Sequence, residues 1–435
     1  MTLTEAAFWT KRFGVIVLIA GTLFILILLF LLSSKDSTLP PEYLSANYAC
    51  TQKKEEFLEH KLEIPSLEVT PDSEMIFELQ TDSGKIDSLP NIVNVYKYTN
   101  LGQIINSQAE AKILATKMGF DPERIVRQGT TGYIWVDNTT GRSLNVRARD
   151  LNFTLKTEHE KIREIRRELD LPTEREAPSI ATNALRSIGV LDQVYTEVQP
   201  TIHLIDINPD GSFSQAESLI TAELIRVDFL RKVPMISIAT NIEGSQQMVD
   251  SLTSKDLTYE TGSKIVNDER VEVYNFSTLL TYQYPVKTNI SVYVGPKNEQ
   301  LKSLQNIYQV EYNTWSLETE SCGTYELVSP SFALQKIQEG EGSLVYLNST
   351  GDEVRPYTVQ SVNKFRVDNM YITYYEGLTE QQYLQPVYMV EGEAELKGGE
   401  RADFFIYYPA INYDIVQDKI ELPPAPIKEE GLLSF

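Results

Sequence analysis

The sequence Phe13–Leu32, FGVIVLIAGTLFILILLFLL, carries no charged residue, and 16 of its 20 residues are Leu, Ile, Val or Phe. A helix rises about 1.5 Å per residue, so this stretch is long enough to cross a bilayer core of about 30 Å. Lys11 and Arg12 directly precede the apolar run, and only Lys35 follows it closely. The bias of basic residues toward the cytoplasmic side predicts a cytoplasmic N-terminus and a long C-terminal part outside.

A cleaved signal peptide is the alternative interpretation of this stretch. The apolar run is longer than a typical signal-peptide core, and it ends in LLSSKDS without a small-x-small cleavage motif. We therefore expect a retained anchor and a single-pass protein of the cell membrane.

The composition limits the partners. The 61 acidic residues exceed the 39 basic ones, which gives a net charge of −22. This charge argues against nucleic acid and anionic lipid surfaces as partners. The acidic residues are scattered along the chain rather than clustered, so they do not indicate a metal site. A chain of 435 residues exceeds one hydrophobic core, and several domains are expected.

The only two cysteines, Cys50 and Cys322, both follow the apolar stretch. In an oxidising compartment they could pair, and a bridge closing so long a loop would stabilise the fold by up to about 5–6 kcal/mol in the chain-entropy model. Two unrelated thiols are the alternative. The sequence leaves this choice open.

The remaining chain predicts an α+β fold. Helical spacing of apolar residues recurs after Ser107, after Pro178 and after Ser329, and a glycine follows each stretch, at Gly119, Gly189 and Gly340. Alternating apolar and polar residues between these stretches predict strands joined by turns. The fold class expected is an N-terminal transmembrane helix followed by tandem modules of one helix packed on an antiparallel β-sheet.

These patterns divide the chain into segments. The predicted organisation is a cytoplasmic N-terminus (1–12), a transmembrane helix (13–32), a stem (33–60), a first α+β module (61–156), a charged helical linker (157–177), a second module (178–258), a third and larger module (259–417) and a disordered tail (418–435).

No motif for catalysis is present in the sequence. The three histidines, His60, His159 and His203, lie far apart and outside any HExxH pattern. A carboxylate pair such as Glu391 and Glu393 arises freely among 61 acidic residues. We therefore predict no catalytic residues, no metal and no cofactor, and a protein that is not an enzyme.

One aromatic cluster is a candidate binding surface for a peptide or a glycan. It consists of Tyr371, Tyr374, Tyr375, Tyr383 and Tyr388. The alternative, which we favour, is a sheet whose faces are rich in tyrosine, since a tyrosine ring can pack while its hydroxyl meets a polar partner.

The C-terminal unit carries a further pattern. A helix opens at Ser329-Pro330-Ser331-Phe332-Ala333-Leu334, a strand ends in Tyr374-Tyr375-Glu376, and the last strand ends in Tyr408-Pro409-Ala410. Residues 325–412 resemble the C-terminal region of YycH/YycI-type extracytoplasmic regulatory proteins and PepSY-like modules. The resemblance implies a non-catalytic protein that acts on a membrane sensor kinase through protein contacts.

The function predicted from these features is that of a membrane-anchored, extracytoplasmic binding or regulatory protein. Its partner would be a membrane protein, with a sensor kinase suspected. The alternative is a cell-envelope peptidase inhibitor, or an envelope enzyme acting on peptide or glycan. The sequence indicates neither the ligand nor the oligomeric state.

Overall fold

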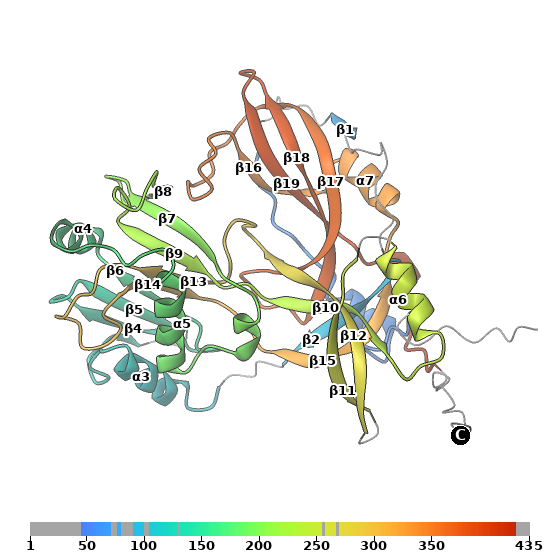
Figure 1. Cartoon of the computed structure of the whole chain (residues 1–435), viewed down its shortest axis with the longest axis horizontal. Coiled ribbons are helices and arrows are strands. Elements are labelled where there is room, and N and C mark those ends of the chain that lie inside the picture. The colour runs from blue at the N-terminus through green and yellow to red at the C-terminus, as the bar shows by residue number, and fades with distance from the viewer. Residues whose placement is uncertain are drawn as a thin grey trace, which may run out of the picture.

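The computed structural model describes residues 45–70, 76–79, 90–99, 104–128, 131–254, 257–266 and 269–422. This part of the chain folds into a nine-stranded sheet and a ten-stranded sheet. Figure 1 shows the first on one side of the molecule and the second on the other, with the long strands β17, β18 and β19 rising from it.

The nine-stranded sheet is antiparallel throughout. Its strands, in spatial order, are β3 (Ile125–Gln128), β4 (Gly132–Asp137), β5 (Arg142–Arg147), β6 (Phe153–Thr157), β14 (Ile307–Tyr312), β13 (Ile290–Val294), β9 (Leu224–Asp228), β7 (Thr201–Ile207) and β8 (Phe213–Gln215).

Helices α3 (Ser107–Lys117) and α5 (Ala177–Ile188) cover one face of this sheet. Their buried residues, including Ala115 and Leu185, share a hydrophobic cluster with Trp135 and Leu155 of the strands. The shorter α4 (His159–Glu168) lies on the opposite face at one end, where Ile162 packs with strands β7, β9, β13 and β14. The central part of that opposite face has no helix over it in the described chain.

The ten-stranded sheet draws its strands from distant parts of the chain. Its main path is β10 (Lys232–Ala239), β12 (Glu269–Tyr282), β17 (Val362–Glu376), β18 (Tyr383–Leu396), β19 (Arg401–Pro409) and β16 (Ser343–Asn348). The strands off this path are β1 (Phe77–Leu79) beside β17, β11 (Glu260–Val266) beside β12, and β2 (Ile92–Tyr98), which pairs with both β15 (Leu317–Glu326) and β18.

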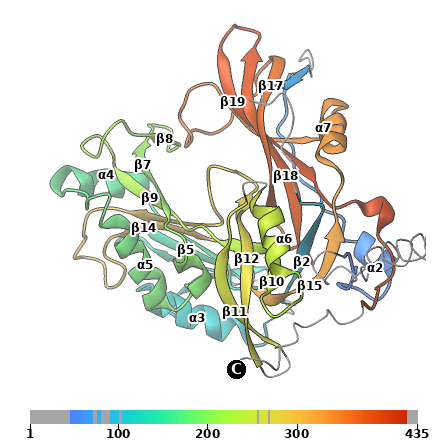
Figure 2. The same ribbon diagram turned by 45° about the vertical axis from the view of Figure 1, so that its right-hand side comes forward.

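Helices α6 (Ser245–Thr253) and α7 (Pro330–Gln338) pack on this second sheet. Helix α7 begins at Ser329, whose hydroxyl caps it by accepting from the Phe332 amide. Helix α6 lies beside β10, as Figure 2 shows. The remaining helical pieces are α2 (Lys54–Leu58), η2 (Gln193–Thr196) and η3 (Tyr413–Ile415).

A disulfide joins Cys50 to Cys322 of β15, across 272 residues of sequence. Gly323 next to it permits the close approach of the two segments, because a Cβ there would lie 2.6 Å from the Ala49 nitrogen. Asn47 completes the contact, since its side-chain oxygen accepts from the Thr324 amide at 2.8 Å. The predicted stem is therefore packed against the ten-stranded sheet from residue 45 onward.

The predicted tandem arrangement of helix-on-sheet modules is wrong. Strand β2 of the expected first module pairs with β15 and β18, while β13 and β14 of the expected third module lie between β6 and β9. Alternating patterns identify strands but not their partners, and here the paired strands come from different predicted modules. The molecule is built on two large sheets rather than on a repeated small unit.

The expected transmembrane helix (13–32) and cytoplasmic N-terminus (1–12) lie outside the described residues. In the described ranges the longest helix, α5, has 12 residues, and none is long and apolar enough to cross a membrane. The prediction of a single-pass membrane protein with a signal anchor is corrected on this finding. Of the tail, residues 418–422 are described, and the Ile420 amide donates to the Asn47 carbonyl.

Candidate functional site

The uncovered face of the nine-stranded sheet is polar. In one register across it, Trp135, Leu144 and Leu155 face the helices and are buried. The neighbouring register places Ile134, Asn145, Thr154, Glu311, Ser291 and Asp228 side by side on the opposite face. Since successive side chains point to opposite faces, the five strands β5, β6, β14, β13 and β9 present a row of polar groups away from the helices, and Ile134 of β4 lies at one end of it.

A cavity of about 740 Å³ lies over this row. The nine-stranded sheet contributes side chains from β4, β5, β6 and β14, among them Asn145, Thr154 and Glu311. Tyr282 of β12 and Leu378, which follows β17, come from the ten-stranded sheet, and the connection from β12 to β13 adds Tyr284. We call this cavity the inter-sheet cleft, because both sheets line it.

The charged groups of the cleft are paired within the protein. Lys287 Nζ donates to Glu311 Oε2 at 2.6 Å, and Gln309 Nε2 donates to Glu311 Oε1 at 2.8 Å. Burial alone would raise the pKa of Glu311, but Lys287 and Gln309 together hold it below its ordinary value. Arg147 donates to Asp150 at 2.8 Å and to Asn313 at 2.9 Å. The cleft therefore presents little net charge to a ligand.

Several uncharged groups of the lining retain their hydrogen-bonding capacity. In the described part of the chain, the side chains of Asn145, Thr154 and Gln283 form no internal hydrogen bond. The Tyr284 side chain is 47% exposed. These four residues present amides, a hydroxyl and an aromatic ring to solvent inside the cleft.

A buried ionic cluster lies behind the cleft. Glu376 is fully buried and accepts from Tyr98 Oη and from Asn289 Nδ2, both at 3.1 Å. Burial raises the pKa of Glu376, and the nearby Arg231 together with these donors offsets only part of that rise. Asn289 also lines the cleft, so the cluster supports one wall of it.

A second buried cluster contains a serine, an aspartate and a histidine but lacks the geometry of a catalytic triad. Ser291 Oγ donates to Asp228 Oδ1 at 2.5 Å, and Arg226 pairs with the other carboxylate oxygen at 2.8 Å. The His203 imidazole lies 3.6 Å from Asp228, and the serine bonds the aspartate rather than the histidine. In a triad the histidine stands between the other two groups, because it must take the serine proton.

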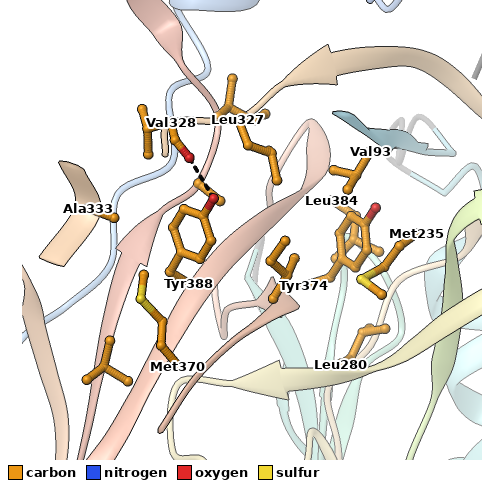
Figure 3. Packing of buried hydrophobic residues seen from close by; sticks show 14 of the residues in the cluster. Val93, Met235, Leu280, Leu327, Val328, Ala333, Met370, Tyr374, Leu384 and Tyr388 are labelled. Atoms are coloured by element: carbon orange, nitrogen blue, oxygen red, sulfur yellow. Dashed lines mark hydrogen bonds between the residues drawn. The ribbon is translucent and has the colours of Figure 1, made fainter. Parts of the chain in front are cut away.

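The predicted tyrosine cluster is mostly buried. Tyr374, Tyr375, Tyr383 and Tyr388 are at most 3% exposed, and Tyr371 is half-buried. Figure 3 shows Tyr374 and Tyr388 among apolar side chains, with the Tyr388 hydroxyl donating to the Val328 carbonyl at 2.6 Å. These rings form the interior of the ten-stranded sheet rather than a groove.

The other residues considered from the sequence lie apart from the cleft. His60 packs against Tyr383, and His159 lies beside Phe213. Glu391 accepts from the Tyr371 hydroxyl at 3.0 Å, and Glu393 pairs with Arg401. Among the described residues, no group of His, Cys, Asp and Glu side chains could hold a metal ion.

Sequence reasoning did not find the inter-sheet cleft. Alternation in RSLNVR (142–147) and FTLKT (153–157) does show that these strands have one polar face. The residues that complete the cleft, Tyr284, Lys287 and Asn289, lie in an irregular connection with no pattern of its own. Nothing in the sequence signalled that this connection lies against the polar face.

No family model matches the chain, and no curated protein matches it significantly. Among solved structures, it is similar to an uncharacterized protein from Eubacterium rectale ATCC 33656, with 12% sequence identity and a TM-score of 0.35. The match covers 87% of this chain and 97% of that one. The resemblance to YycH/YycI-type proteins has no support in these comparisons. The sensor kinase was implied by that resemblance alone.

Proposed function

We propose that this protein is a non-catalytic binding and regulatory protein of an oxidising compartment, and that its ligand occupies the inter-sheet cleft. The observation that carries the proposal is the cleft itself: a polar sheet face under a cavity of about 740 Å³, with its charges already paired. This volume falls within the range of about 300–1,000 Å³ typical of small-ligand sites.

The state of the ionisable groups supports binding rather than chemistry. The carboxylate that lines the cleft, Glu311, is tied to Lys287 and has a lowered pKa. A general base or acid works best with a pKa near the working pH. The buried Ser291 is committed to Asp228 and is fully inaccessible, so it does not offer a nucleophile to the cleft.

The disulfide supports the compartment. Disulfides persist in oxidising environments and are rare where thiols are kept reduced. The bond between Cys50 and Cys322 fixes the first described segment to β15, so the bond is part of the ten-stranded sheet's structure.

The regulatory part of the proposal follows from the two-sided lining. A ligand in the cleft contacts strands of the nine-stranded sheet together with Tyr282 and Leu378 from the other sheet. Contacts made only when the two sheets adopt one relative position would shift the protein toward that position. A partner protein that binds only this arrangement of the two sheets would then respond to the ligand.

The test uses the full-length protein with mixtures of oligosaccharides, peptides and small metabolites. Bound compounds are recovered and identified by mass spectrometry before and after prolonged incubation. We expect a compound that is retained unchanged and that is lost from Asn145→Trp, which fills the cleft from an exposed position on β5. Asn138→Trp, in the β4–β5 turn outside the cleft lining, is the matched control and should still bind.

Two results would overturn this function. Conversion of the retained compound by the purified protein would contradict a non-catalytic role. Retention that is equal in Asn145→Trp and in the wild type would place the binding site elsewhere.

A further inference from the structure

The inter-sheet cleft carries an inference about the class of its ligand. We infer that it binds a short, uncharged oligosaccharide, with a sugar ring stacked on Tyr284 and hydroxyl groups bonded to Asn145, Thr154 and Gln283. This inference rests on the proposed function, because it names the ligand of the same site.

The charge balance of the cleft disfavours an ionic ligand. A cationic ligand would need an unpaired carboxylate, and Glu311 already accepts from Lys287 and Gln309. An anionic ligand would need a free cation, but Lys287 is held at 2.6 Å by Glu311 and Arg147 is held by Asp150. The net charge of −22 repels anions further. An uncharged polar ligand requires none of these pairs to break.

The uncharged groups match vicinal hydroxyls. An amide side chain offers two N–H donors and a carbonyl acceptor, and a hydroxyl both donates and accepts. Asn145 and Thr154 are cross-strand partners on β5 and β6, so the two groups are neighbours on one face. Each hydroxyl of a sugar ring can also donate and accept. Two neighbouring sugar hydroxyls can therefore hydrogen-bond to Asn145 and Thr154 without any charge.

Tyr284 supplies the aromatic surface. It lies in the connection from β12 to β13, lines the cleft and leaves 47% of its side chain exposed. The less polar face of a sugar ring, formed by C–H groups, packs well on an aromatic ring. An exposed tyrosine beside unpaired amides therefore favours a sugar over a wholly apolar ligand, which would leave those amides without partners.

An extended peptide fits the cleft less well. Peptides that bind sheets usually add a strand to a free edge, where backbone groups are unpaired. Here β4, β5, β6 and β14 each pair with a neighbour on both sides, and the cleft lies over their face. Recognition must therefore come from side chains, as it does for saccharides.

The experiment measures binding to the full-length protein by titration calorimetry. The neutral probes are cellotetraose, maltotetraose and chitotetraose. The comparison probes are tetragalacturonic acid, a glucosamine tetramer and a tetra-alanine peptide, which separate acidic, basic and peptide ligands of similar length. We expect binding of at least one neutral probe and none of the charged ones.

Three variants locate the site. Tyr284→Ala should weaken binding of the neutral probe about tenfold or more, which corresponds to about 1.4 kcal/mol. Tyr284→Phe retains the ring and should bind within about threefold of the wild type. Phe332→Ala removes an aromatic side chain of similar exposure (41%) on α7, outside the cleft, and should not change binding.

The outcomes separate the inference from the function on which it rests. Binding of a charged probe or of the peptide, weakened by Tyr284→Ala, would overturn the saccharide class and leave the cleft as a binding site. Neutral-probe binding that Tyr284→Ala does not weaken would overturn the stacking geometry. Absence of binding by every probe class would overturn the saccharide inference, while the proposed function is decided separately by the compound mixtures and the Asn145→Trp comparison.

Discussion

The two sheets bury their apolar side chains in different ways. The nine-stranded sheet separates its faces, with helices α3 and α5 on the apolar one and the inter-sheet cleft on the polar one. The ten-stranded sheet buries aromatic residues within its own layers, among them Phe365, Tyr374 and Tyr388, all fully buried. The separated face leaves room for a ligand, whereas the fully buried rings fill the interior of the ten-stranded sheet.

Both sheets contain local and long-range strand pairs, and one region of each shows how the two kinds are stabilised. Strands β3 to β6 form a continuous antiparallel run over residues 125–157. In the ten-stranded sheet, β2 pairs with β15, and the disulfide between Cys50 and Cys322 lies at this long-range junction. We infer that local pairing stabilises the first region and that covalent closure supports the second.

The largest effect should come from the helix-covered face of the nine-stranded sheet. Trp135 is 1% exposed and packs beneath α3 and α5. Trp135→Ala should lower the free energy of unfolding by about 3–5 kcal/mol, because it leaves a large cavity. Urea denaturation followed by circular dichroism measures this loss.

Val136 gives the matched control for this change. It follows Trp135 in β4, points to the opposite face and is 42% exposed. Val136→Ala should change stability by less than about 0.5 kcal/mol. Equal losses at the two positions would contradict the separation of the faces.

The next effect concerns the covalent junction of the ten-stranded sheet. Replacing both cysteines, Cys50→Ser with Cys322→Ser, should lower the free energy of unfolding by about 2–5 kcal/mol, because the unfolded chain gains conformational entropy. Hydrogen exchange should show the largest loss of protection at β2 and β15, next to the missing bond, and a smaller loss at β4 to β6. Uniform loss of protection over both sheets would show that the disulfide stabilises the whole molecule.

The contrast between the sheets also explains what could be predicted from the sequence. The apolar periodicity predicted helices that the structure contains at Ser107–Lys117, Ala177–Ile188 and Pro330–Gln338. Gly189 ends the second of these helices with a φ of 81°. These features depend on neighbours within a few residues, which is the range over which capping and periodicity act.

Long-range pairing and the candidate site could not be predicted in the same way. Tyr374 and Tyr388 belong to a tyrosine-rich stretch that could have formed a binding surface. In the structure, side chains of α7 and β2 bury them. Tyr284 has no pattern around it, yet it is exposed in the cleft. Whether a tyrosine is in the core or in a site depends on which distant strand lies over it, and alternation does not encode this.

A smaller effect should distinguish buried from cleft tyrosines. Tyr388→Phe removes the hydroxyl that donates to the Val328 carbonyl inside the core. This change should lower the free energy of unfolding by about 1–2 kcal/mol, since the Val328 carbonyl is left without this donor. Tyr284→Phe removes a solvent-facing hydroxyl and should leave stability unchanged in the same thermal or urea unfolding measurement. A loss at Tyr284 equal to that at Tyr388 would contradict the difference in their surroundings.

The smallest effects concern the pH dependence of stability at the two buried clusters, and they have opposite signs. Burial raises the pKa of Glu376 above its ordinary value of 4.5, despite the lowering effect of Arg231. As pH rises above about 4.5 the unfolded chain loses this proton before the folded one does, so stability falls until the raised pKa is passed.

Burial and Arg226 lower the pKa of His203 below its ordinary value of 6.5, although Asp228 and Glu353 act in the opposite direction. As pH falls below about 6.5 the unfolded chain gains this proton first, so stability falls on acidification.

Measurement of the unfolding free energy from pH 4 to 8 separates these contributions, with the wild type compared with Glu376→Gln and His203→Gln. The stability of the wild type relative to Glu376→Gln should decrease as pH rises, and relative to His203→Gln it should increase. Slopes of the same sign in the two comparisons would show that the pKa of one of these groups is shifted in the opposite direction in the folded protein, and a zero slope would show that the group keeps its ordinary pKa. The Glu376 cluster behind the cleft and the cluster of Asp228 and His203 on the polar sheet face are thus expected to respond to pH in opposite directions. Burial disfavours the charged form of an acid in the first cluster and of a base in the second.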